Sequence, residues 1–201
     1  MKKKIFVMIS GRGSNFLKIY ENIKSGYLKA EICGVFSNKK DAKGIEKAKE
    51  FGLNVFVIEN KGFPTRRDHE IQIEKIIDDL VPDFIVLAGY MRILTEEFVR
   101  KYKWKIINIH PALLPSFPGV EAQRQALDYG VKFSGCTVHF VNEGVDSGPI
   151  ILQRVVPVFD EDTVETLEER ILKEEHIAYT EALKLLTEKN WEVKGRRFFV
   201  L

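Results

Sequence analysis

Residues 4–24 read KIFVMISGRGSNFLKIYENIK, and this stretch decides the fold of the first half of the chain. Its apolar run at 4–10 is typical of a buried strand, and its second part, which is followed by Gly26, is typical of a helix. The same alternation continues outward to residue 110. Strands are expected at 31–37, 54–59, 84–90 and 105–110, and helices at 41–51, 65–80 and 95–102. This alternation predicts right-handed βαβ units and a doubly wound, mostly parallel, Rossmann-like α/β sheet.

The second half of the chain follows a different pattern. HPALLPSFPG at 110–119 contains three prolines and is expected to be a constrained loop. A helix is expected at 121–130, a long helix at about 163–188 with a start signal in Asp162 and Glu165, and a small hairpin at 191–201. The apolar runs 136–141 and 150–158 are joined by a loop that is too short for a crossover helix, so these strands should pair antiparallel. The sheet is therefore expected to be mixed.

Composition excludes several classes of protein. The net charge of +2 is too close to neutral to favour a nucleic-acid or membrane-surface partner. The chain lacks a run of about 18 apolar residues and a signal peptide, so no membrane span or export is expected. Cys33 and Cys136 lie in apolar runs and are interpreted as core residues, which fits a reducing, cytoplasmic location.

The glycine-rich loop Ser10–Asn15 is a candidate phosphate site. Glycines between a strand and a helix let the backbone approach an anion, and the helix N-terminus supplies N–H donors. The loop is not the dinucleotide fingerprint, because Phe16 stands where the third glycine belongs and the second strand ends without an acid. A glycine turn that serves only tight packing is an equally strong interpretation.

Asn108 and His110 form the central polar pair of the sequence. Side chains alternate along a strand, so these two share one face near the strand's C-terminal end, where open α/β sheets bind ligands. Pro111 keeps His110 extended and so fixes its direction. A lone histidine at a strand end is more often structural, but the pairing with asparagine favours a functional site.

Asp146 lies in the glycine-flanked loop 142–149. An aspartate there is ordinarily a turn former. If the loop folds over the end of the His110 strand, the carboxylate would orient the ring and support its charged form. An amide, an imidazolium and a carboxylate suit acyl transfer to an amine, because they can stabilise an oxyanion and move a proton.

Five motifs of the chain carry a family resemblance. They are ISGRGSN at 9–15, FSNKKDAKGIEKAKEFG at 36–52, VLAGYMRIL at 86–94, INIHPALLPSFPG at 107–119 and VNEGVDSGPIILQ at 141–153. In this order and at this spacing they make the chain resemble the glycinamide ribonucleotide formyltransferases. The resemblance implies a single formyltransferase-type domain over residues 1–201. Its nucleotide-binding half is about 1–110, and its folate-binding and catalytic half is about 88–201.

The resemblance also implies an activity. It is transfer of a formyl group from 10-formyltetrahydrofolate to the amine of glycinamide ribonucleotide in purine (IMP) synthesis, which yields formylglycinamide ribonucleotide and tetrahydrofolate. It implies no metal, no nucleic-acid or membrane partner, and a monomer or weak homodimer. The site residues that it implies are catalytic Asn108, His110 and Asp146; ribonucleotide-binding Gly13, Ser14, Asn15, Leu172, Lys173, Glu174 and Glu175; and folate-binding Arg66, Met91, Arg92, Ile93, Leu94, Asn108, Asn142, Glu143, Gly144, Val145 and Asp146.

Some of these positions have plainer interpretations. Glu175 falls on the inward apolar stripe of the long helix, where it could bind the substrate or pair with a core-facing arginine. Arg66 and Arg92 could be solvated charges, although a guanidinium suits the glutamate carboxylates of folate. Met91, Ile93 and Leu94 could be plain core, although a pterin slot also needs apolar walls. Leu172 could make a polar contact only through its backbone.

The sequence pattern has three rival functional interpretations. The resemblance implies that methionyl-tRNA formyltransferase also carries a C-terminal RNA-binding barrel, for which the residues after 110 leave no room. It implies that formyltetrahydrofolate deformylase carries a regulatory domain before its first strand, which here begins near Ile5. A non-catalytic nucleotide-binding module would keep the glycine loop but would not need Asn108, His110 and Asp146.

Overall fold

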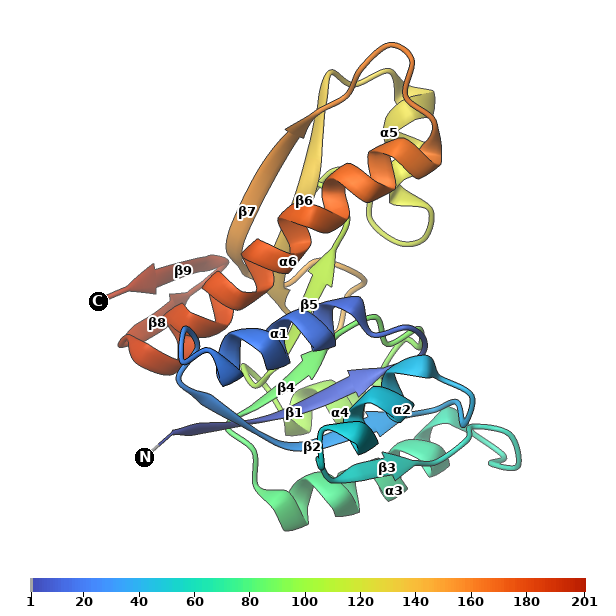
Figure 1. Cartoon of the computed structure of the whole chain (residues 1–201), viewed down its shortest axis with the longest axis vertical. Helices are drawn as coiled ribbons and strands as arrows, with labels where there is room; N and C mark the ends of the chain where they lie inside the picture. Colours follow the sequence, from blue (N-terminus) through green and yellow to red (C-terminus); the bar gives the residue numbers. More distant parts are fainter. Residues whose placement is uncertain (1) are drawn as a thin grey trace. The chain divides into compact units, whose positions relative to one another are not determined.

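The computed structural model describes residues 2–201 and has a mixed α/β fold with a central, mostly parallel sheet (Figure 1). This confirms the predicted fold class. The chain forms two compact units, one ending at Ile107 and the other comprising Asn108–Leu201. The boundary falls inside strand β5 (Ile106–His110). Each unit is described by itself below.

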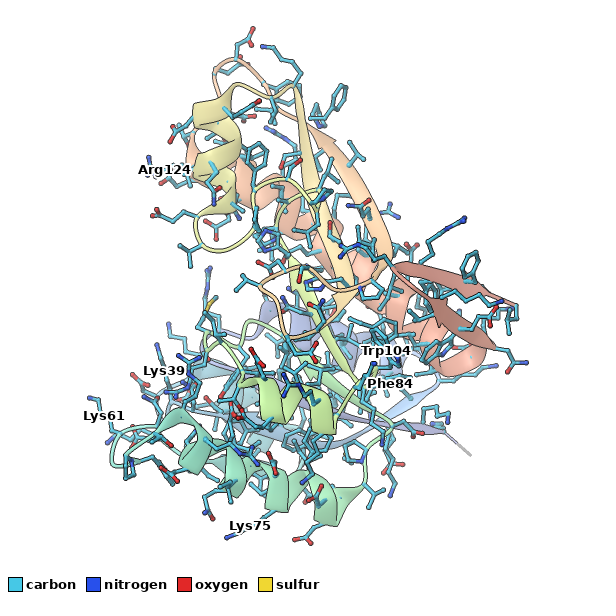
Figure 2. All side chains as sticks on the ribbon, turned by 180° about the vertical axis from the view of Figure 1, so that it is seen from behind. Lys39, Lys61, Lys75, Phe84, Trp104 and Arg124 are labelled. Carbon is cyan, nitrogen blue, oxygen red and sulfur yellow. The ribbon has the colours of Figure 1, made fainter. Side chains whose placement is uncertain are left out.

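The first unit is a parallel sheet with helices on both faces. Its strands lie in the order β3-β2-β1-β4, and every recorded pair among them is parallel. Helices α1 and α2 cover one face and α3 and α4 cover the other (Figures 1 and 2). The elements are β1 (Lys3–Ile9), α1 (Ser14–Lys24), β2 (Ala30–Ser37), α2 (Lys43–Glu50), β3 (Val55–Val57), α3 (Arg66–Leu80), β4 (Phe84–Leu87) and α4 (Glu96–Lys101).

The core of the first unit follows from its apolar strands. The side chains from Ile5 to Ile9 are completely buried, as a strand covered on both faces requires. Helix α3 begins with a reciprocal capping box, in which Thr65 and Asp68 each accept a hydrogen bond from the other's backbone N–H. It ends at Val81, which adopts a left-handed conformation. The elements expected from the sequence are all present here.

The second unit combines antiparallel strands with one long helix. It contains α5 (Ala122–Tyr129), β6 (Phe133–Phe140), β7 (Ile150–Pro157), α6 (Val164–Glu188), β8 (Trp191–Lys194) and β9 (Arg197–Val200). The predicted antiparallel pairing of β6 with β7 and the predicted C-terminal hairpin are both confirmed. Strand β9 also pairs in parallel with β7 at Ile150, a contact that the sequence pattern did not predict.

The start of α6 differs from the expected one. Thr163, not Asp162, is the N-cap, and it exchanges hydrogen bonds with Thr166 in a capping box. Asp162 instead accepts hydrogen bonds from the Phe159 backbone, the Thr166 hydroxyl and the Arg170 guanidinium, which holds the pKa of its carboxyl well below the usual range. The carboxylate therefore supports the helix start from one residue farther out.

Candidate functional site

Strand β5 presents Asn108 and His110 from one face. His110 is 4% exposed, whereas Asn108 and the intervening Ile109 are half-buried. The predicted shared face is supported by contacts: Asn108 reaches His139, and both His139 and His110 reach Asp146. The strand ends in the loop 111–119, which carries the acceptor for His110.

Both ring nitrogens of His110 face acceptors. Nε2 lies 2.7 Å from the carbonyl oxygen of Phe117, and Nδ1 lies 3.3 Å from Oδ2 of Asp146. A carbonyl oxygen and a carboxylate only accept hydrogen bonds. This arrangement therefore suits a ring that is protonated on both nitrogens, with Asp146 as its counter-ion.

The structure brings Asp146 to His110, as the sequence predicts. Asp146 has a φ of 46°, in the left-handed region, so it does form a turn. Its Oδ2 also accepts a hydrogen bond of 2.8 Å from the backbone N–H of Gly119. The carboxylate thus ties the loop 142–149 to the loop 111–119 and faces the imidazole at the same time.

A buried polar network fixes the loop that follows His110. The hydroxyl of Thr137, on β6, donates to the Ala112 carbonyl and accepts from the Leu114 N–H at 3.0 Å. The side chain of Gln153, on β7, donates both to the Leu114 carbonyl and to the Thr137 hydroxyl, each at 2.9 Å. The proline-rich loop is therefore held by side chains of two neighbouring strands.

His139, on β6, is a member of the cluster that the sequence reading missed. Its Nε2 lies 3.4 Å from Nδ2 of Asn108 and 3.6 Å from Oδ1 of Asp146. In the sequence it lies inside an apolar strand, where a histidine is interpreted as a buried core residue. The signal that could have found it is its i,i+2 spacing from Thr137, which places both on one face of β6.

The predicted loop residues around Asp146 have a compact local structure. Oδ1 of Asn142 accepts a hydrogen bond of 2.8 Å from the Ser147 hydroxyl. A Cβ on Gly144 would lie 2.2 Å from that hydroxyl oxygen, so a side chain there would push the Ser147 hydroxyl away from Asn142. Val145 is 55% exposed, and Glu143 is also exposed. Asn142–Asp146 therefore lies together with Asn108 and His110 in the second unit.

In the first unit, the loop of Gly13, Ser14 and Asn15 leads directly into α1. Gly13 is the N-cap residue and adopts a left-handed conformation with a φ of 69°. Gly13 has no side chain with which to cap this helix start, and the first turn contains no acid. The first N–H groups of a helix have no acceptor within it, so they and the positive end of the helix dipole meet at the loop, as an anion site needs.

Gly44 on α2 is a glycine whose role sequence reading did not identify. Its N–H donates a 3.1 Å hydrogen bond to the Gly11 carbonyl. A Cβ at position 44 would lie 2.5 Å from the end of the Ile9 side chain and 3.2 Å from the Arg12 carbonyl oxygen. The close approach of α2 to the loop 11–13 therefore depends on glycine.

The predicted folate segment 91–94 is not core. Met91 is 77% exposed and Ile93 is 63% exposed, while Leu94 and Arg92 are half-buried. The Met91 backbone is held by Ser10, whose hydroxyl accepts from the Met91 N–H at 2.8 Å and donates to Oδ1 of Asn38 at 2.6 Å. Ser10 therefore links the start of the glycine loop to this segment within one unit.

Arg66 and Arg92 lie within electrostatic reach of the same phenol. Burial raises the pKa of Tyr90, and the two guanidinium groups act against that rise. Arg66, at the start of α3, is exposed. Two cations and two exposed apolar side chains thus occur in one part of the first unit.

The segment Leu172–Glu175 lies inside the unbroken helix α6. Its backbone N–H groups are used by the helix, so a polar contact of Leu172 with a ligand would have to use its carbonyl oxygen. Lys173 is exposed, and Glu174 accepts a hydrogen bond from Nε of Arg154. Glu175 is buried at 9% exposure, which confirms its place on the inward stripe.

Two further findings concern the described residues 2–201. No helix there is both long and apolar enough to cross a bilayer. No group of three or more His, Cys, Asp or Glu side chains in that range is arranged to hold a metal ion.

Comparisons with known proteins show the family to which this chain belongs. The model of the family described as "Formyl transferase" matches residues 3–183. The chain belongs to the formyl transferase family. The phosphoribosylglycinamide formyltransferase of Haemophilus influenzae is 42% identical over 96% of this chain and 91% of its own length. The crystal structure of glycinamide ribonucleotide transformylase 1 from Symbiobacterium toebii shares the fold with a TM-score of 0.96 and 43% identity, over 100% of this chain and 94% of that one.

Other relatives of this formyl transferase are much longer. The trifunctional purine biosynthetic protein adenosine-3 of Drosophila pseudoobscura pseudoobscura is 45% identical over 92% of this chain. This chain spans only 14% of that protein's length, and 18% of its human counterpart. The shared part is therefore the formyl transferase portion of those proteins.

Proposed function

We propose that this chain transfers the formyl group of 10-formyltetrahydrofolate to the amine of glycinamide ribonucleotide, a step of purine synthesis. The observation that carries the proposal is the contact of His110 with Asp146, beside Asn108 on the same strand, in a chain of the formyl transferase family. The products are formylglycinamide ribonucleotide and tetrahydrofolate.

His110 and Asn108 act on the oxygen of the formyl group. When the substrate amine attacks the formyl carbon, negative charge develops on that oxygen. His110 offers it the Nε2–H that now bonds to the Phe117 carbonyl, and Asn108 offers an N–H of its amide. Two donors at this position lower the energy of the charged, tetrahedral state.

Asp146 keeps His110 charged and oriented for that role. Its Oδ2 faces Nδ1 of the ring, so the ring cannot turn without losing the contact. The attacking amine must lose a proton and the departing folate nitrogen must gain one. The charged His110 can give a proton to the departing nitrogen, and the Asp146 carboxylate can accept the proton that the amine loses.

The residues of the first unit fit the two substrates. 10-Formyltetrahydrofolate supplies an activated formyl group on a nitrogen that leaves readily. The exposed Met91 and Ile93 suit its flat ring, and the guanidinium groups of Arg66 and Arg92 suit its glutamate carboxylates.

The glycine loop fits the ribonucleotide. Gly13 and the uncapped start of α1 suit its phosphate, because they offer backbone N–H groups and little side-chain bulk. Lys173 and the buried Glu175 are the proposed contacts from α6. The expected cytoplasmic location and the expected monomer or weak homodimer remain predictions.

A direct assay tests the proposed function. The purified chain is mixed with 10-formyltetrahydrofolate, with and without glycinamide ribonucleotide, and the release of tetrahydrofolate is followed. Release that requires the amine supports the transferase. Release without the amine would replace it with a hydrolase, and no release in either mixture would overturn the proposed substrates.

His110→Ala tests the mechanism in the same assay. We expect this variant to fold, because the polar contacts of the ring are with one carbonyl and one carboxylate of two loops, and to lose turnover by about 10²- to 10⁴-fold. Circular dichroism checks the fold. Turnover near that of the wild type would contradict the assigned role of His110.

A further inference from the structure

His139 is a buried titratable side chain that the mechanism above does not use. It is 2% exposed and lies on β6, next to a point where the pairing with β7 shifts register. Val138 pairs with Leu152 and His139 pairs with Ile150, so Ile151 is the extra residue of a bulge. Bulges re-aim side chains, and this one lies where the strand meets Asn108 and Asp146.

The backbone decides which ring nitrogen of His139 carries the proton. Nδ1 lies 2.9 Å from the carbonyl oxygen of Phe140, which only accepts hydrogen bonds. Nδ1 must therefore donate. Burial lowers the pKa of His139 below its usual value, and the nearby charge of His110 acts in the same direction, while the Phe140 carbonyl and Asp146 oppose it. The ring is therefore neutral, with a bare Nε2.

A bare Nε2 is an acceptor, and the Asn108 amide faces it. Nδ2 of Asn108 lies 3.4 Å from that nitrogen, so the amide donates to the ring. If the amide turned over, its oxygen would face the lone pair of Nε2 and the two acceptors would repel each other. The neutral ring therefore selects one of the two orientations of a half-buried amide.

Because Nε2 of His139 carries no proton, His139 does not compete with His110 for the Asp146 carboxylate. Oδ1 of Asp146 lies 3.6 Å from Nε2 of His139, and no proton lies between them. Oδ2 faces Nδ1 of His110 at 3.3 Å. A protonated His139 would compete for the carboxylate and would also repel the charged His110. Asp146 and His110 are the charged groups that face His139 in this cluster.

We propose that His139 is a positioning residue of the formyl transfer reaction, a neutral hydrogen-bond acceptor that takes one N–H of the Asn108 amide and leaves the other N–H available to the formyl oxygen. The proposal rests on the proposed function for its effect on turnover. The arrangement of the side chains themselves can be measured without substrates.

Nitrogen NMR on the full, ¹⁵N-labelled chain tests the arrangement first. Long-range proton–nitrogen correlations give the protonation of each histidine ring, and a His139→Asn variant identifies the His139 signals. We expect Nδ1 protonated and Nε2 bare at about pH 7.5. We also expect the side-chain amide signal of Asn108 to move when His139 titrates in acid. A ring protonated at Nε2 at that pH, or an Asn108 amide that ignores the titration, would overturn the proposal.

Two matched variants then test the effect on catalysis. His139→Asn keeps a donor for the Phe140 carbonyl but removes the acceptor for Asn108. His139→Gln places an amide oxygen near the position of Nε2. We expect kcat to fall about tenfold in His139→Asn with both KM values within about twofold, and the Gln variant to recover much of the loss.

The outcomes separate a positioning role from a structural one. Thermal unfolding shows whether each variant folds. If both variants lose turnover equally, or if His139→Asn folds and keeps full turnover, His139 does not act through Asn108. If the wild type transfers no formyl group but the NMR result holds, the proposed function fails while the Asn108–His139 arrangement stands.

Discussion

At the scale of single residues, Asp146 shows how one carboxylate can face an imidazole and hold two loops together. Its Oδ2 accepts the Gly119 N–H and faces His110, while its backbone occupies a left-handed turn. The hydrogen bond to Gly119 needs only an oxygen, whereas the contact with a charged imidazole needs the negative charge. The two roles can therefore be separated by removing the charge and keeping the shape.

Asp146→Asn makes that separation. Oδ1 of the asparagine can still accept the Gly119 N–H, so we expect the fold and thermal stability to change little. We expect kcat to fall by about 10²- to 10⁴-fold, because His110 loses its counter-ion. Steady-state kinetics and a melting curve measure the two effects. A variant with turnover within about threefold of the wild type would show that the charge is not needed.

The buried His69 is expected to make the stability of the fold depend on pH. It is fully buried on α3, its Nε2 donates to the Ile58 carbonyl at 2.8 Å, and its Nδ1 has no hydrogen-bond partner among the described residues 2–201. Burial lowers its pKa below the usual 6.5, and Arg92 adds to this while Glu70 opposes it. The unfolded chain therefore binds a proton more readily than the folded chain.

The stability that neutral His69 contributes is complete above pH 6.5 and is lost as the pH falls below that value. His139 acts in the same direction. Carboxyl groups with a lowered pKa, such as Glu74, lose their contribution only below about 4.5. Urea unfolding at about pH 7.5 and about pH 5.5 should give a lower free energy of unfolding at the lower pH. His69→Gln should narrow the difference, and an unchanged difference would refute the assignment.

The sequence predicted that Asn108, His110 and Asp146 lie together, but not what surrounds them. Asn108 and His110 follow from strand alternation, and Asp146 from its loop and the family motif. The sequence did not predict His139 and Thr137 as part of the site, because a polar residue inside an apolar strand is interpreted as a core residue until its neighbours are known. The hydrogen-bond partners of such a side chain depend on which strands pair with its own. The sequence pattern of one strand does not contain that information.

At the scale of elements, α2 shapes the glycine loop through one position. Gly44 lets the helix approach so closely that its N–H bonds to the Gly11 carbonyl. The loop in turn sets the backbone N–H groups at the start of α1. A methyl group on Gly44 would push against Ile9 and against backbone oxygens of the loop, so it would move the proposed phosphate contacts without touching the catalytic cluster.

Gly44→Ala should therefore raise the KM for glycinamide ribonucleotide. We expect an increase of about tenfold, with kcat and the KM for the folate within about twofold of the wild type. Lys49→Ala, an exposed position on the same helix, is the control and should change nothing. If Gly44→Ala alters the folate KM instead, the loop does not hold the ribonucleotide.

Element boundaries were predicted unevenly, for physical reasons. Helix α3 begins and ends close to the predicted residues because Thr65 caps it and Val81 closes it. Strand β6 begins at Phe133, three residues earlier than predicted, because pairing with β7 extends it through Ser134 and Gly135. Pairing partners lie far away in sequence, so a local pattern cannot reveal where a ladder stops.

At the scale of the whole molecule, β5 belongs to both compact units. Its first two residues, Ile106 and Ile107, are fully buried in the first unit, and Asn108 begins the second. If Ile106 and Ile107 lose their strand structure, Asn108 and His110 on the same strand lose their support. The sequence predicted one domain, since it shows no linker, and a shared strand is a physical reason for the two units to unfold together.

The two tryptophans of the chain can test this cooperativity, because each unit contains one. Trp104, labelled in Figure 2, lies just before β5, and Trp191 begins β8. In the single-tryptophan variants Trp191→Phe and Trp104→Phe, fluorescence reports on the first and the second unit respectively. We expect the urea midpoints of the two reporters to coincide after each is corrected for its variant's overall stability by circular dichroism. Coincidence of the fluorescence and circular dichroism curves in both variants means one cooperative domain. A tryptophan curve displaced from the circular dichroism curve means that one unit unfolds while the other persists, and that β5 does not couple them.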